Sequence, residues 1–179
     1  RDIARHLGAD EASLYLEERA TETMVKSVAL DTRRVVAFAT HGLLSGELTG
    51  FTEPALVLTP PDKGTPEDDG LLTASEVAQL KLNADWVILS ACNTAAADTP
   101  GAEGLSGLAK AFFYAGARTL LVSHWPVNSY AATQLTTQMF DVLGGNPAIG
   151  RAEAFRKSMM ALADMKYRSH PAFWAPFVV

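Results

Sequence analysis

The sequence predicts an α/β fold in which helices flank a mostly parallel sheet. Three runs of apolar and β-branched residues, at positions 35–40, 86–91 and 119–123, are typical of strands buried on both faces of such a sheet. Segments with helical spacing of apolar residues alternate with these runs, as in consecutive βαβ units. At 179 residues the chain is long enough for one core, so we expect a single domain over residues 1–179.

The first half of the chain carries clear local signals. Thr73-Ala74-Ser75-Glu76 is a capping box, in which the Thr73 hydroxyl and the Glu76 carboxylate each satisfy a backbone donor at the start of a helix. Three prolines and two glycines predict a surface loop over residues 59–70. The other predictions are a helix over residues 1–7, a strand over 13–16, a helix over 20–30, a loop over 42–53 and a strand over 55–58.

In the second half, helices are predicted from apolar stripes and from their termini. Residues 105–115 carry such a stripe, and Gly116 closes the helix. Asn146-Pro147 supplies an N-cap and a first-turn proline for the last long helix. The remaining predictions are an exposed loop over residues 93–104, a helix over 128–143 and a final strand over 173–179.

Composition excludes several classes of function. The net charge is −5, from 15 basic and 20 acidic residues, and no basic cluster occurs, which argues against direct contact with nucleic acid. No apolar run approaches the roughly 18 residues of a membrane-spanning helix, so we expect no membrane contact. The single cysteine, Cys92, excludes internal disulfides and cysteine-rich zinc sites and suits a reducing cytoplasm. Because the chain starts at Arg1 and ends inside an expected strand, we expect a fragment of a longer protein, truncated at both ends.

Two chemically capable side chains follow the expected strands. His41 comes after the run at 35–40, and Cys92 after the run at 86–91. Because reactive groups collect at the carboxyl ends of strands in an open α/β sheet, we expect them side by side, with His41 as general base for the Cys92 nucleophile of a cysteine peptidase. Their separation of 51 residues is close to the roughly 50 found in caspases. The competing interpretation is structural, with Cys92 as a small buried residue and His41 as a hydrogen-bonded histidine.

Neighbouring residues extend this predicted site. The backbone N–H groups of Gly42 and Cys92 are candidate donors to the oxyanion of a tetrahedral intermediate. His124 follows the run at 119–123, so it is a candidate substrate-binding residue at the same edge, or it packs on Trp125. Trp125 is expected in the core or as the wall of a substrate pocket.

Short motifs also occur in order over roughly residues 33–179. They are Ala39-Thr40-His41-Gly42, Asp69-Gly70-Leu71-Leu72-Thr73-Ala74-Ser75-Glu76-Val77, Leu89-Ser90-Ala91-Cys92-Asn93-Thr94, Glu103-Gly104-Leu105, Ala115-Gly116-Ala117-Arg118, Trp125-Pro126-Val127 and His170-Pro171-Ala172-Phe173-Trp174-Ala175-Pro176-Phe177. As a set, they resemble the successive signatures of the CHAT domain, a caspase- and separase-like module that is often attached to tetratricopeptide repeats.

The resemblance implies a caspase-haemoglobinase fold, a three-layer α/β sandwich with His41 and Cys92 as its catalytic dyad. It implies a protein or peptide substrate, an N-terminal repeat or regulatory region in the full-length chain, and no metal or organic cofactor. The chain departs from the family pattern at Asn93, where Glu is common, and at His124, where Leu is common. Both departures leave the dyad in place and the substrate preference open.

The segments that border the dyad lack positive charge, which predicts a basic residue before the scissile bond. Residues 41–58 and 91–108 contain no Lys or Arg. Carboxylates in these segments can meet a guanidinium or ammonium group. Asp98 and Glu103 are the first choices because they lie in the loop after the nucleophile. An apolar pocket with Trp125 as its wall is the alternative. The acidic residues of the two segments are Glu47, Glu53, Asp98 and Glu103.

Two other functions compete with a peptidase. The first is a catalytically silent CHAT module that acts as an interaction scaffold beside repeats, although such a module has no need to keep both His41 and Cys92. The second is another cysteine enzyme on a doubly wound sheet, such as an amidotransferase. That enzyme requires glycines two residues on either side of the nucleophile, where this chain has Ser90 and Thr94.

Overall fold

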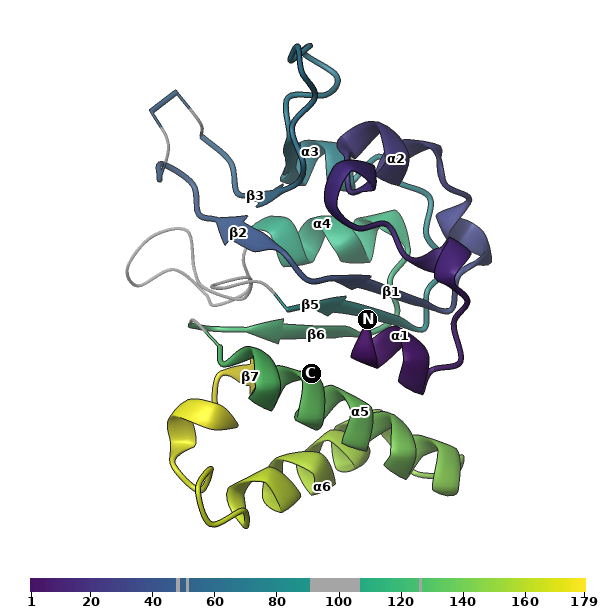
Figure 1. Ribbon diagram of the computed structural model, residues 1–179, viewed down its shortest axis with the longest axis vertical. Coiled ribbons are helices and arrows are strands. Elements are labelled where there is room, and N and C mark those ends of the chain that lie inside the picture. The colour runs from purple at the N-terminus through teal and green to yellow at the C-terminus, as the bar shows by residue number, and fades with distance from the viewer. Residues whose placement is uncertain (48, 51, 91–106, 126) are drawn as a thin grey trace. The chain divides into compact units, whose positions relative to one another are not determined.

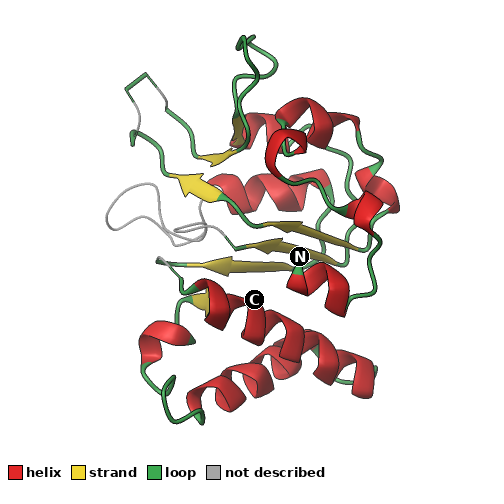
Figure 2. Ribbon diagram, in the orientation of Figure 1, coloured by secondary structure: helices red, strands yellow, loops and turns green. Residues whose placement is uncertain are grey.

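The structure, a computed structural model, describes residues 1–47, 49, 50, 52–90, 107–125 and 127–179. The chain forms two compact units, of which one is Tyr15–Pro126 and the other combines Arg1–Leu14 with Val127–Val179. Figures 1 and 2 show helices and strands alternating along the chain, so the predicted α/β class is confirmed.

A parallel sheet forms the centre of the unit Tyr15–Pro126. Its strands are β1 (Val35–Phe38), β5 (Trp86–Leu89) and β6 (Leu120–Ser123), in the order β1-β5-β6. Every residue of β5 and β6 is buried, as expected for parallel strands that are covered on both faces. The three apolar runs therefore form strands as predicted, each shorter than its run.

A second sheet in this unit is antiparallel, which corrects the expectation of one mostly parallel sheet. It consists of β2 (His41–Leu43), β3 (Ala55–Val57) and β4 (Leu71–Thr73), in the order β2-β3-β4. The loop predicted over residues 42–53 thus begins with a strand. Three-residue strands are too short for a period-two pattern, and for this reason the sequence did not reveal β2 and β4.

Among the described residues of this unit, three α-helices accompany these sheets: α2 (Glu22–Ser27), α3 (Ala74–Val77) and α4 (Gly107–Ala115). The predicted capping box is confirmed at α3, where Thr73 and Glu76 satisfy each other's backbone groups. Gly116 follows α4 with φ +111°, as expected for a glycine that closes a helix. In Figure 1, α4 runs along one face of β1 and β5, and the ring centroid of its Phe112 lies 5.5 Å from that of Phe38.

The other unit is mostly helical. It contains α1 (Asp2–His6), α5 (Ser129–Gly145), α6 (Arg151–Ala163) and a short strand, β7 (Phe177–Val178). Helices α5 and α6 pack against each other through a buried apolar face. The buried side chains of that face include Ala131, Leu135, Met139, Ala154, Phe155 and Leu162.

Three predictions for this unit were wrong. The expected strand at 13–16 is replaced by a 3₁₀ turn, Glu11–Ser13, because the Asp10 carboxylate accepts from the backbone N–H of Ser13. Asn146 does not begin the last helix but ends α5, and α6 starts only after Gly150. The final strand is short because Pro171–Phe173 forms another 3₁₀ turn.

Candidate active site

His41 begins β2, three residues after β1 ends at Phe38, and its side chain is exposed. It pairs with Val57 of β3, so the histidine belongs to the antiparallel sheet and not to the parallel one. The preceding residue, Thr40, donates a hydrogen bond from its hydroxyl to the carbonyl oxygen of Val57. The backbone that carries the imidazole is therefore attached to β3 by its own pairing and by its neighbour's side chain.

The pairing of β1 and β5 determines where the predicted dyad emerges from the sheet. Val35 pairs with Trp86 and Phe38 with Leu89, so each residue of β1 lies opposite the residue 51 positions later. Cys92 itself lies outside the described residues, as do Asp98 and Glu103. The distance between the Cys92 sulfur and the His41 ring thus stays a prediction.

Gly42, a predicted oxyanion donor, is half-buried and pairs with Leu56 of β3. Because Leu56 is fully buried in the centre of the antiparallel sheet, the Gly42 backbone is held in a regular strand. Its role as a donor to an oxyanion stays a prediction.

His124 and Trp125 directly follow β6, the strand beside β5. Since the strands are parallel, the two residues leave the sheet at the same edge as Ser90, which directly follows β5. His124 is half-buried, and its ring centroid lies 6.5 Å from that of Trp125. Trp125 is 43% exposed, so the expectation of a core residue is wrong and a role at a surface is left. Burial ends one residue earlier, at the fully buried Ser123.

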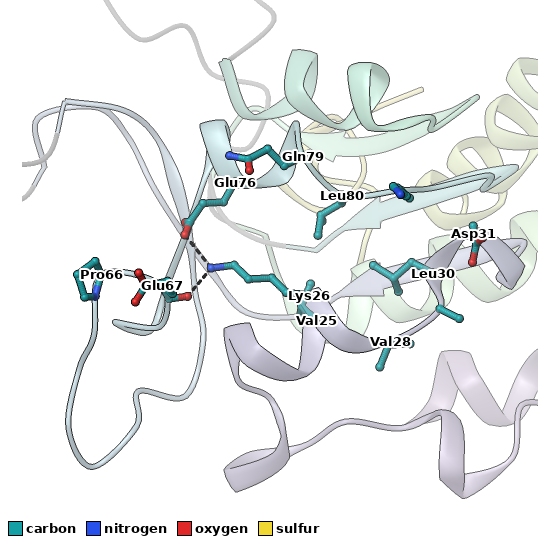
Figure 3. A pocket seen from close by; sticks show the side chains of 12 residues that line it. Val25, Lys26, Val28, Leu30, Asp31, Pro66, Glu67, Glu76, Gln79 and Leu80 are labelled. Atoms are coloured by element: carbon teal, nitrogen blue, oxygen red, sulfur yellow. Dashed lines mark hydrogen bonds and ion pairs between the residues drawn. The ribbon is translucent and has the colours of Figure 1, made fainter.

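A groove of about 620 Å³ lies elsewhere in this unit, between α2 and α3, and contains none of the predicted site residues. Figure 3 shows Lys26 reaching across it toward Glu76 of α3 and the backbone of Glu67. Its apolar walls include Val25, Val28 and Leu80. An ion pair thus crosses the groove, which suits a structural connection between two helices.

The charges of this cluster stabilise each other. Burial by itself would lower the pKa of Lys26, but hydrogen bonds and charge interactions with Glu76 and Glu22 outweigh it and raise that pKa above its usual value. Burial would likewise raise the pKa of Glu76, but hydrogen bonds from Lys26 and Thr73 hold it below its usual value. Both groups are therefore charged near neutral pH.

Two residues that tie distant segments of this unit together were not singled out from the sequence. Thr40 was noted only as part of a motif, although its hydroxyl ties the His41 segment to β3. Glu22 was not noted at all, yet it is among the most deeply buried charged residues described. The available signal was its spacing of four from Lys26, which is typical of a helical ion pair.

In the part of the chain that the structure describes, no group of three or more His, Cys, Asp and Glu side chains could hold a metal ion. Over the same residues, no helix combines the length and the apolarity needed to span a membrane.

Known proteins that are similar to this chain indicate its family. The family model of the CHAT domain matches residues 1–179. Tetratricopeptide repeat protein 28 of Mus musculus is 31% identical over 196 residues, which cover 89% of this chain and 8% of that protein. Its Homo sapiens counterpart is also 31% identical over 89% of this chain, and 7% of that protein is covered. The chain thus spans less than a tenth of the length of these curated relatives.

Proposed function

This chain belongs to the CHAT domain family, and from that premise we propose that it is a cysteine endopeptidase domain with a caspase-haemoglobinase fold. The observation that carries the proposal is the match between strand register and residue spacing. Paired residues of β1 and β5 are 51 positions apart, and so are His41 and Cys92. Each therefore follows the last paired residue of its strand by three positions, which favours their meeting at one edge.

In the proposed reaction, Cys92 and His41 share the chemistry of one acyl transfer. The imidazole of His41 takes the thiol proton as the sulfur attacks the peptide carbonyl carbon, and the carbonyl π electrons move onto the oxygen. The N–H groups of Gly42 and Cys92 donate to this oxyanion. The oxyanion collapses, the C–N bond breaks and the leaving amine takes the proton from His41. Water then attacks the thioester, releases the acid and restores the thiol.

A basic residue before the scissile bond is the proposed preference. Glu47 accepts a backbone hydrogen bond from Leu44 (2.8 Å) and Glu53 accepts one from Ser75 (2.8 Å), so both carboxylates already have a partner within the domain. Asp98 and Glu103 are the proposed partners of the substrate's positive charge because they follow Cys92 closely in the sequence. An apolar pocket against the exposed Trp125 is the alternative for substrate recognition.

The second candidate function is an interaction scaffold without catalysis. It is favoured by the curated relatives, which are named as tetratricopeptide repeat proteins. The same relatives support a repeat region as a neighbour or partner of this domain, and this region is proposed here to be regulatory. A single cysteine that must stay a thiol also fits a reducing compartment, so a cytoplasmic location is part of the proposal.

Alkylation of the single cysteine separates these functions. An activated Cys92 reacts with iodoacetamide at pH 7 faster than a free cysteine model does, and His41→Ala slows this reaction at least about tenfold. His6→Gln is the matched control, because His6 belongs to the unit that does not contain His41. Within that unit its ring nitrogen contacts the carboxylate of Asp141 (2.9 Å). A wild-type rate equal to that of His41→Ala would contradict the peptidase and leave the scaffold.

A further inference from the structure

A buried carboxylate holds the end of the loop that joins β3 to β4. Glu22 of α2 is only 1% exposed, and glutamates are seldom so deeply buried unless their charge is paired. Its Oε2 accepts hydrogen bonds from the backbone N–H groups of Asp69 (2.7 Å) and Gly70 (2.6 Å). Its Oε1 accepts from Nζ of Lys26 (2.9 Å). Such charge-assisted bonds are stronger than neutral ones, so the loop end is firmly attached to α2.

The same helix holds the loop at two further points. The Thr23 hydroxyl and backbone N–H both donate to Oδ2 of Asp68, at 2.5 and 3.2 Å. Nζ of Lys26 donates to the carbonyl oxygen of Glu67 (2.5 Å), as the dashed line in Figure 3 marks. Four successive loop residues, 67–70, are therefore bonded to one turn of α2, and Glu22 is the buried member of the set.

From Gly70 the connection continues to the histidine. The Gly70 carbonyl oxygen accepts from the N–H of Leu58 (2.8 Å), directly after β3 ends at Val57. Val57 pairs with His41, and its carbonyl oxygen accepts from Thr40. The loop passes close to Pro60 at Gly70, where φ is +89° and an added Cβ would lie 2.9 Å from the Pro60 side chain. A displacement at Gly70 is thus passed to the end of β3.

We propose that Glu22 is a positioning residue that fixes the segment carrying His41. It acts through Gly70 and the end of β3. The inference rests on the proposed function, in which His41 is the general base. A general base works only when it is held within hydrogen-bond reach of the proton it removes. Loosening its backbone should therefore slow the transfer without abolishing it.

Glu22→Gln tests the inference with two measurements. Glutamine keeps the size of the side chain but has one acceptor oxygen and no charge, so it cannot serve all three donors. Hydrogen exchange of the β2 and β3 amides should rise about tenfold, while exchange in β1, β5 and β6 stays unchanged. Alkylation of Cys92 should slow about tenfold, with its pH profile displaced upward, because a misplaced base no longer favours the thiolate.

Glu18→Gln is the matched control, since Glu18 is an exposed glutamate in the neighbouring 3₁₀ turn Glu17–Arg19. It should leave both measurements unchanged. If Glu22→Gln does not fold, Thr23→Val replaces it, because it removes only the hydroxyl contact to Asp68 from an exposed position. In Thr23→Val we expect the same two changes, faster hydrogen exchange in β2 and β3 and slower alkylation of Cys92, but both smaller than in Glu22→Gln.

Each outcome decides a separate question. If hydrogen exchange in Glu22→Gln is unchanged, or if it rises equally in the parallel and the antiparallel sheet, the positioning role is overturned. Selective exchange in β2 and β3 with an unchanged alkylation rate also overturns it. Failure of the proposed function has another signature, namely that His41→Ala leaves alkylation unchanged. In that case the exchange pattern alone decides whether Glu22 orders the segment.

Discussion

The backbone N–H of Ser90 donates a hydrogen bond to the carbonyl oxygen of Phe38 at 2.9 Å, one residue beyond the last paired position of β5. This bond keeps the ends of β1 and β5 together at the carboxyl edge of the parallel sheet. His41 follows Phe38 by three residues, and Cys92 follows Ser90 by two. The two chain segments therefore start from a common edge as they lead to the predicted dyad.

The first prediction concerns the proximity of these residues. Cys92 is the single cysteine, so His41→Cys creates the one possible intramolecular disulfide. We expect this disulfide to form on mild oxidation, because residues that leave paired strands together can come within the roughly 7 Å between Cα atoms that a disulfide allows. Thiol titration and non-reducing electrophoresis measure it. Arg33→Cys, exposed at the amino end of β1, should keep both thiols free. Equal thiol contents in the two variants would argue against the dyad.

The second prediction concerns substrate preference. A peptide library should show faster cleavage after Arg or Lys than after Asp, and Asp98→Asn or Glu103→Gln should reduce this preference at least about tenfold in kcat/KM. Glu47→Gln and Glu53→Gln are the controls, because both carboxylates already accept backbone hydrogen bonds. A preference for Asp would contradict the acidic pocket. A preference for large apolar residues, lost in Trp125→Ala, would favour the apolar one.

The third prediction concerns stability against pH. The pKa of Glu76 is lower in the folded chain than its ordinary value of 4.5, so the unfolded chain binds this proton first as the pH falls. Its contribution to the free energy of unfolding is present at neutral pH and is lost from about pH 5 downward. Glu76→Gln keeps the capping box but removes the titration, so urea unfolding should depend less on pH below about 5. If the free energy of unfolding falls with pH equally steeply in wild type and Glu76→Gln, this role of Glu76 is contradicted.

Lys26 determines the upper pH limit of the stabilisation by this cluster. Its pKa is raised above 10.5 in the folded chain, so its contribution is complete below that pH and is lost as the pH rises through the folded value. The cluster should therefore contribute fully between about pH 5 and about pH 10.

The fourth prediction compares two adjacent phenylalanines of α4. Phe112 is fully buried, with its ring 5.5 Å from that of Phe38, whereas Phe113 is 45% exposed. Phe112→Ala should lower the free energy of unfolding by about 3–5 kcal/mol, and Phe113→Ala by less than about 1 kcal/mol. Because both changes affect helix propensity equally, the difference in denaturant unfolding measures burial. Similar losses in both variants would contradict the described packing of α4.

The fifth prediction compares two glycines. At Gly116 an added Cβ would lie 2.3 Å from the carbonyl oxygen of Leu82, and φ is +111°. Gly116→Ala should therefore lower the free energy of unfolding by more than about 2 kcal/mol. Gly144, near the end of α5, has nothing within 4 Å of that position, so Gly144→Ala should raise it by up to about 1 kcal/mol. Thermal unfolding measures both, and a tolerated Gly116→Ala would contradict this prediction.

Elements whose signals are local could be predicted from the amino-acid sequence. The capping box at Thr73 and Glu76 was predictable because both groups bond within one turn. The glycine after α4 and the three apolar runs were predictable for the same kind of reason, since a few adjacent residues decide a helix end or a buried strand. The places of His41 and Cys92 after two such strands are equally local features, and they suffice to suggest the proposed dyad.

Features that depend on distant partners became visible only in the folded chain. His41 joins a second, antiparallel sheet because its partner Val57 comes from a separate segment. Glu22 is buried because its Oε2 accepts from backbone donors 47 and 48 residues later, at Asp69 and Gly70. Trp125 is exposed although its type favours burial. The first two cases are determined by long-range contacts, which leave no pattern in neighbouring residues.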